Sequence, residues 1–399
     1  MLAALTILLC HGISKQDIRV CVWLLGNCSQ RSTFESHSTI GVVKTICQSS
    51  QVIMDSDTKE PGATGTISQA KLDFIPNRDL WYSDGSVVLV AEKTAFRVHS
   101  TILAAHSEVF RDMFAIPQPI LADPDVEIYE SCQVLHLQDS PADLGHFLKS
   151  IYDLSYFIPG KKTKFPIVSA VLRLSTKYHT PVLRQRAIDL LVTVYPSSAE
   201  AWQLRSLHRL VPPFEDEHLA YIELAVETDV RVILPAIYYA ATREPLSGVV
   251  STLARLRVAP SEQWNVTSNF LLGRDRLAQA EMKYILAFLD KRFPRPNCQG
   301  GNDSTTLVNL AHTTFRKVFE SEPYHHWCSA RPAEVGPSLP VCKRCSAAIR
   351  NSIELGRQKI WENLPGFFGL PDWETLRARD GLDDLVFPSS PQSPDLVDE

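Results

Sequence analysis

The fold is decided by residues 84–114, which read DGSVVLVAEKTAFRVHSTILAAHSEVFRDMF. In the first half of this stretch, the apolar and β-branched run at 87–91 predicts a buried strand between polar turn residues. Residues 96–98 then alternate between apolar and polar side chains, which predicts the second arm of a hairpin with one buried face. We therefore expect an ordered domain that begins near residue 79 with a β-hairpin.

Two short helical patterns follow the hairpin, at residues 101–105 and 108–114. Ser107 stands directly before the second pattern, where a serine hydroxyl can accept a hydrogen bond from the first turn of a helix. Three apolar residues are spaced i, i+3 and i+4 and so share one face of this second helix, namely Phe110, Met113 and Phe114. That face either packs into a core or contacts another protein.

Strand and helix patterns continue to residue 195. Residues 133–137 predict another strand, which follows a loop that is rich in proline. Three helices are predicted next: one that starts at Pro141, one over 166–178 and one over 181–195. A hairpin, a helical pair, a strand and three helices make a compact α+β domain over residues 79–195.

This domain resembles the BTB/POZ domain. The likeness rests on the hairpin, on the His-x-x-x-Leu-Ala helix from His99 and on the Ser-x-x-Phe-x-x-Met-Phe helix from Ser107, and it covers residues 79–195. The wider layout of the chain looks like that of the BTB proteins abundant in fungi. The resemblance implies a protein-interaction module rather than a catalyst, because relatives commonly dimerise and recruit cullin scaffolds of ubiquitin ligases or transcriptional corepressors.

The resemblance also implies where partners bind. Phe110, Met113 and Phe114 would line a partner-facing groove, and packing in the core is the alternative for each of them. Two positions depart from the family pattern, because Ser86 stands where Asp is usual and Ser100 where many members carry a basic residue. In corepressor-recruiting relatives those positions form a charged pocket at the dimer interface, so corepressor binding is not expected here.

The cullin-binding relatives usually present an apolar-x-Glu triplet after the second of these helices. Residues 128–130 read Ile-Tyr-Glu and have that shape, although they follow an apparent insertion. Such triplets are common by chance, so this one adds little to the case for a cullin.

Beyond residue 195 the pattern is helical. Apolar spacing predicts helices over 215–227, 230–241, 277–288, 307–318 and 346–363. Pro235 should split or kink the second of them, and the Leu-Pro-Gly at 364–366 should end the last.

The fold class predicted for the whole chain is α+β: a BTB/POZ fold with a small sheet and helical hairpins, followed by a mostly α-helical C-terminal region. Residues 1–70 lack periodicity and are predicted to be a poorly ordered leader. Residues 196–385 form the helical region, which includes a cysteine cluster. The acidic, Ser/Pro-rich tail at 386–399 is predicted to be disordered.

The cysteine cluster carries the one metal-like spacing. Two residues separate Cys342 from Cys345, which lets both thiolates turn onto one Zn²⁺, and Cys298 and Cys328 are candidates for the other two ligands. Three histidines are the available substitutes: His312, His325 and His326. Such a zinc would be structural rather than catalytic. The alternative is four unrelated cysteines, or a redox-active pair.

Composition and motifs exclude several classes of protein. The 40 Lys and Arg against 45 Asp and Glu indicate no broad basic surface for nucleic acid. No apolar run reaches the ~20 residues that span a bilayer. His99 has no nucleophile or carboxylate at a catalytic spacing, so we expect a protein that is not an enzyme. Nine cysteines with long gaps do not form a secreted disulfide framework, so we expect an intracellular protein, cytoplasmic or nuclear.

The sequence therefore predicts a non-enzymatic adaptor that acts through its BTB domain. In the specific version it is a homodimer that recruits substrates to a cullin-type ubiquitin ligase, with no nucleic-acid or membrane partner. The alternative is a transcriptional or chromatin regulator whose C-terminal region is stabilised by zinc.

Overall fold

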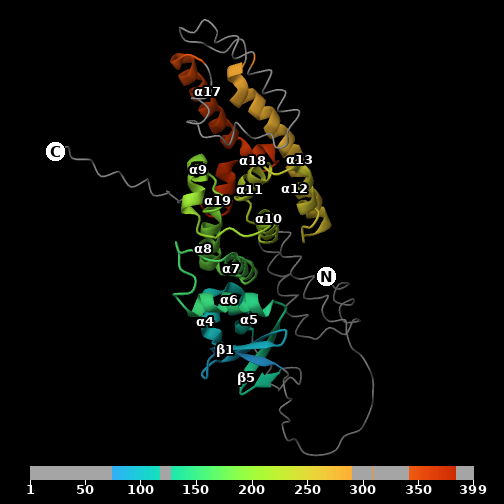
Figure 1. Ribbon diagram of the computed structural model, residues 1–399. Helices are drawn as coiled ribbons and strands as arrows, with labels where there is room; N and C mark the ends of the chain where they lie inside the picture. The colour runs from blue at the N-terminus through green and yellow to red at the C-terminus, as the bar shows by residue number, and fades with distance from the viewer. Residues whose placement is uncertain (1–73, 117–126, 290–308, 310–340, 383–399) are drawn as a thin grey trace, which may run out of the picture. The chain divides into compact units, whose positions relative to one another are not determined.

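A computed structural model describes residues 74–116, 127–289, 309 and 341–382 of the protein (Figure 1). The predicted leader at 1–70, the predicted helix at 307–318 apart from residue 309, and the tail at 386–399 lie outside the described residues.

The first described elements form a five-stranded mixed sheet. Its strands are β1 (Ile75–Trp81), β2 (Val87–Ala91), β3 (Thr94–Val98), β4 (Ile128–Tyr129) and β5 (Cys132–Leu137). They are ordered β1-β3-β2-β5-β4, with β2 antiparallel to β3 and parallel to β5. The predicted hairpin and the predicted third strand are confirmed. Two further strands, β1 and β4, add to the sheet at its edges.

The central strand β2 is buried on both faces, as its unbroken apolar run predicts. On one face, Leu89 joins Phe96 in the main core beneath the helices. On the opposite face, Val88 and Val90 lie in a smaller cluster against three partly buried aromatic side chains, Phe74, Trp81 and Tyr129. The rings of these three aromatic residues contact one another edge to face or tilted.

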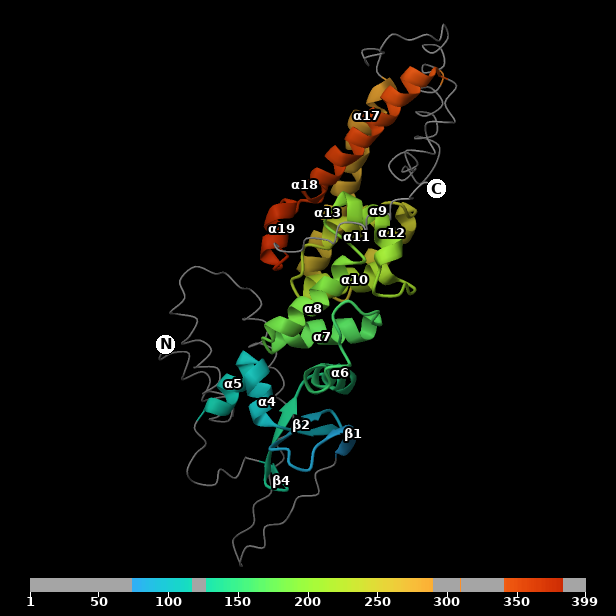
Figure 2. The same cartoon turned by 90° about the vertical axis from the view of Figure 1, so that its left-hand side faces the viewer.

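Five helices complete this part of the chain, and α4, α5 and α6 lie on one side of the sheet (Figures 1 and 2). The helices are α4 (Ser100–His106), α5 (Glu108–Ala115), α6 (Pro141–Tyr152), α7 (Phe165–Lys177) and α8 (Pro181–Val192). All five were expected from the sequence. The hydroxyl of Ser140 accepts a hydrogen bond from the Asp143 N–H at 3.4 Å, so Ser140 caps α6 directly before Pro141.

The rest of the described chain is helical. It contains α9 (Ala199–His208), α10 (Glu217–Glu227), α11 (Leu234–Ala241), α12 (Leu246–Leu253), α13 (Pro260–Ala280), the π-helix η1 (Glu281–Ile285), the 3₁₀ helix η2 (Leu286–Leu289), α17 (Lys343–Glu362), α18 (Leu364–Phe367) and α19 (Trp373–Arg379). The predicted fold class, an α+β domain followed by a mostly helical region, is confirmed.

Of two predictions made from proline positions, one was wrong and one is confirmed. Pro235 neither splits nor kinks a helix, because α11 begins at Leu234 and places Pro235 in its first turn, where a missing N–H costs nothing. The Leu-Pro-Gly at 364–366 does end the preceding helix, because α17 ends at Glu362, and Pro365 then lies in the first turn of α18. Both prolines therefore stand in the first turn of a new helix.

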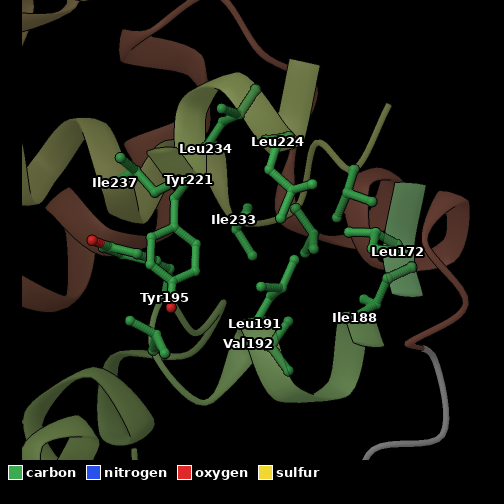
Figure 3. Close-up of a cluster of buried hydrophobic side chains, with 14 of the residues drawn as sticks. Leu172, Ile188, Leu191, Val192, Tyr195, Tyr221, Leu224, Ile233, Leu234 and Ile237 are labelled. Atoms are coloured by element: carbon green, nitrogen blue, oxygen red, sulfur yellow. The ribbon is translucent and has the colours of Figure 1, made fainter. Parts of the chain in front are cut away.

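The main hydrophobic core continues from the sheet-bearing part into the helical region. Figure 3 shows side chains from α7 and α8 that point toward side chains from α10 and α11. Leu191 and Tyr195 meet Tyr221 and Leu224 in this cluster, and all four are buried. The ring centroids of Tyr195 and Tyr221 lie 5.0 Å apart in an edge-to-face contact. The boundary expected near residue 195 therefore separates two regions that differ in sequence pattern. In the structure, these two regions share one hydrophobic core.

The C-terminal helices are fastened to this core by contacts between distant parts of the sequence. Trp361 donates its indole N–H to the Ser197 carbonyl at 3.1 Å, and Asp380 accepts the Val232 N–H at 2.8 Å. Gly356 lets α17 approach η1, because a Cβ at that position would lie 2.5 Å from the Tyr284 carbonyl oxygen.

Candidate functional site

The helix α5 is held in place by the turn between α7 and α8. The Ser107 hydroxyl caps α5 by accepting the Phe110 N–H at 3.1 Å, and it also donates to the Tyr178 carbonyl at 2.5 Å. The Glu108 N–H donates to the carbonyl of His179, which adopts a positive φ of 50°. These bonds fix the direction in which α5 presents its side chains.

A polar network around the buried carboxylate of Asp139 supports this turn. Lys177 donates to Asp139 at 2.7 Å, and the Tyr178 hydroxyl donates to the other oxygen of the same carboxylate. Burial, together with the charge of Asp139, strongly raises the pKa of the Tyr178 hydroxyl. Tyr178 therefore stays protonated and acts as a structural donor beneath α5.

The three predicted partner-facing residues do not share one environment. Phe110 is fully buried, and its ring stacks on Tyr178 with a centroid distance of 4.6 Å, so it packs in the core. Met113 and Phe114 are half-buried and pack against the edge of that core. The structure thus assigns Phe110 to the packing alternative. Whether Met113 and Phe114 also contact a partner stays a prediction.

Sequence reasoning missed the neighbouring residue Val109. It is 37% exposed and lies one turn before Met113 on the same face of α5. Ile116, the C-cap of α5, continues this face and is half-buried. We call Val109, Met113 and Ile116 the α5 stripe. Its i, i+4, i+7 spacing is present in the sequence, but the two phenylalanines Phe110 and Phe114 give the adjacent face the stronger apolar pattern.

The two serines that depart from the family pattern lie together. The Ser86 and Ser100 hydroxyl oxygens are 2.9 Å apart, and the Ser100 N–H donates to the Ser86 hydroxyl at 2.9 Å. Ser86 thereby satisfies an N–H at the start of α4, whose N-cap residue His99 provides no side-chain cap. His99 instead lies between Asp84, at 3.2 Å, and the Tyr152 hydroxyl, at 3.2 Å.

The apolar-x-Glu triplet lies at the opposite end of the sheet from β1. Ile128 is exposed on β4, and Glu130 forms an ion pair with Arg97 at 2.8 Å. The same guanidinium donates to the Gly85 carbonyl at 3.1 Å, and the Cys132 thiol donates to that carbonyl at 3.0 Å. Glu130 is thus already engaged within the domain.

The cysteine cluster is only partly described. Cys342 is the N-cap residue of α17, and Cys345 lies buried in the first turn of the same helix. Cys298 and Cys328, the other predicted ligands, lie outside the described residues, as do His312, His325 and His326. Within the described ranges, no three His, Cys, Asp or Glu side chains are grouped as a metal site. The zinc site therefore stays a prediction.

Comparison with known proteins now identifies the sheet-bearing part. The sequence model of the BTB/POZ domain matches residues 82–194, from the end of β1 to just past α8. These residues form a BTB/POZ domain. No curated protein and no solved structure matches the chain.

A BTB domain is an interaction module, and such domains generally serve protein–protein contacts and adaptor roles rather than catalysis. The predicted domain type is therefore confirmed, and protein partners are the expected ligands. Among the described helices, none combines the length and apolar character needed to cross a membrane.

Proposed function

We propose that this chain is a self-associating adaptor that joins a protein partner to a larger assembly, specifically as a substrate adaptor of a cullin-type ubiquitin ligase. One observation carries the proposal. The α5 stripe exposes apolar side chains on a helix whose position is fixed by Ser107 and the α7–α8 turn. A rigid apolar surface loses little conformational entropy when a partner covers it.

The surroundings of the α5 stripe suit a protein interface. Exposed charges flank it, with Glu108 and Arg111 exposed and Asp112 half-buried on the same helix. An apolar centre with a polar rim is the usual anatomy of such contacts, in which the rim sets specificity. The exposed Ile128 of β4 offers a further apolar contact, whereas the ion pair of Glu130 with Arg97 must open before that carboxylate can meet a partner.

Self-association is supported by the Ser86–Ser100 pair. These positions carry charges at the dimer interface of corepressor-recruiting relatives, whereas here two hydroxyls satisfy each other. Burying paired hydroxyls between two copies costs less than burying charges. We therefore infer a homodimer that does not recruit corepressors through this pocket.

The test is capture of a cullin by the full chain, compared between wild type and Met113→Asp. The matched control is Met282→Asp, which changes a 39% exposed methionine on η1 in the helical region. We expect wild type and Met282→Asp to capture the cullin and Met113→Asp to lose capture while its circular dichroism stays unchanged. Failure of the folded wild type to bind, or equal binding by all three proteins, would overturn the cullin version.

A second candidate function is transcriptional or chromatin regulation with a zinc-stabilised C-terminal region. Its support is the placement of Cys342 and Cys345 at the N-terminus of α17, where the helix dipole favours thiolates. Metal analysis of the wild-type full chain should find one bound zinc ion. The double variant Cys342→Ser/Cys345→Ser should lose this zinc, whereas the control variant Cys132→Ser should keep it. Absence of zinc from wild type excludes the metal, and a cytoplasmic location speaks against this candidate.

A further inference from the structure

Two arginines of the helical region place their guanidinium groups near the ring of the same tryptophan, Trp202. The guanidinium carbon of Arg205, on α9, lies 3.6 Å from the centroid of the Trp202 ring. Arg243, just after α11, lies 5.7 Å from the same centroid and 5.3 Å from that of Tyr239. Trp202 itself is buried and contacts Trp361, so this platform is rigid.

The nearby carboxylates are engaged elsewhere. Glu217 accepts two hydrogen bonds from Arg209, and Glu244 lies 3.3 Å from His218. Among the described residues, neither Arg205 nor Arg243 forms an ion pair with an acidic side chain. The cluster therefore holds two positive charges that the described part of the chain does not neutralise.

Both arginines are half-buried, which makes the missing counter-charge costly. The Arg243 Nε is buried and has no hydrogen-bond partner in the described part of the chain. Burial and the charge of Arg243 lower the pKa of Arg205. A guanidinium that stacks on an aromatic ring can still donate N–H groups at the edge of its own plane. Arg205 Nη1 donates to the Trp202 carbonyl at 2.8 Å, and the other N–H groups of the pair can meet an oxyanion.

We propose that Arg205, Arg243 and Trp202 form a binding site for the carboxylate side chains of an acidic peptide in a partner protein. Charge complementarity supports this occupant, because a carboxylate accepts the paired N–H groups of a guanidinium. The surface next to Arg205 favours a peptide as the ligand, because it offers apolar contacts: Leu204 is exposed and Leu207 is 78% exposed on the same helix. The site lies outside the BTB domain and is independent of cullin binding.

The test uses the full chain and a fluorescein-labelled peptide, Glu-Leu-Glu-Glu-Leu-Glu, with the Gln-for-Glu peptide as its control. Fluorescence anisotropy should detect binding of the Glu peptide and little binding of the Gln peptide, and added salt should weaken it. Arg205→Gln/Arg243→Gln should lower the affinity at least roughly tenfold. The matched variant Arg257→Gln, which changes an exposed arginine, should bind like wild type.

Further variants keep the outcome decisive. Arg205→Lys/Arg243→Lys retains both charges but not the planar fork, so it should bind with intermediate affinity and serves if the Gln variant does not fold. Equal affinity of wild type and a folded Gln variant would overturn the site, as would the absence of binding by wild type. Binding only after removal of residues 383–399, which contain Asp383 and Asp384, would overturn a partner peptide in favour of the chain's own segment.

Discussion

The BTB domain and the helical region are built on different kinds of contact. In the BTB domain, short motifs set the local structure, as when Ser107 caps α5 three residues from Phe110. In the helical region, the decisive contacts join residues far apart in the chain, such as Trp361 with Ser197 and Asp380 with Val232. The first kind can be seen in a sequence, whereas the second appears only in three dimensions.

The two regions are nevertheless joined. Side chains of α7 and α8 from the BTB domain and of α10 and α11 from the helical region form one buried cluster. The helical region thus supplies part of the core on which the BTB helices rest. Substitutions in each region test whether the shared packing or the local motifs contribute more to the stability of the protein.

The largest effect is expected within the BTB domain at α5. Phe110→Ala removes a fully buried ring and should lower the free energy of unfolding by about 3–5 kcal/mol. Met113→Ala, on the half-buried face, should cost clearly less, because less area leaves contact. Urea unfolding measures both, and equal losses would show that Phe110 is not the core residue of this helix.

The next effect concerns the close approach of α17 to η1. Gly356→Ala places a Cβ against the Tyr284 backbone and should cost roughly 1–3 kcal/mol. Gly248→Ala is the control, because the space around this exposed glycine of α12 is open and alanine favours helix. Thermal unfolding should rank Gly356→Ala below wild type and Gly248→Ala at or above it. The reverse order would contradict tight packing in the helical region.

A smaller loss is expected at the serine pair of the BTB domain. Ser86→Ala leaves the Ser100 N–H without its acceptor at the start of α4 and should cost about 1 kcal/mol. Ser83→Ala changes an exposed serine three residues earlier and should be neutral. If chemical denaturation finds the two variants equally stable, the hydroxyl of Ser86 does not cap α4.

The smallest effect is a pH dependence at α6. Burial lowers the pKa of His146 below its ordinary 6.5, against the smaller opposing influence of Asp143, and its ring contacts the Tyr156 hydroxyl. The unfolded chain then binds a proton more readily, so His146 favours folding above pH 6.5 and this contribution is lost as the pH falls through the lowered pKa. Melting temperatures between pH 7.5 and pH 5 should fall less for His146→Gln than for wild type, whereas exposed His106→Gln should follow wild type.

Much of the BTB fold could be predicted because its signals are local. The apolar run of β2, the cap of α5 and the proline at the start of α6 each act within a few residues. Strand β1 was missed because it contains Pro76 and little alternation, and its pairing with β3 arises only in the sheet. Strand β4 is too short to give a pattern.

The structure of the helical region was harder to predict from the sequence, for a physical reason. Trp264 is exposed on α13, together with Leu271 and Leu272, which obscures the apolar stripe that marks a helix. Gly273 lies within α13 because a Cβ there would meet the Phe368 ring, a contact from a distant segment. In the candidate site, the spacing of Phe110 and Met113 in the sequence places them on one helix face. Only their burial in the structure shows that Phe110 packs in the core and that Met113 is partly exposed.

The BTB domain and the helical region share one hydrophobic core. Amide hydrogen exchange on full-length wild type and Leu224→Ala tests it most directly, because Leu224 is a fully buried residue of α10 in that core. We predict faster exchange in α7 and α8 of the BTB domain as well as in α10 and α11, and no such change for the exposed Leu355→Ala. Faster exchange confined to the helical region would contradict a shared core.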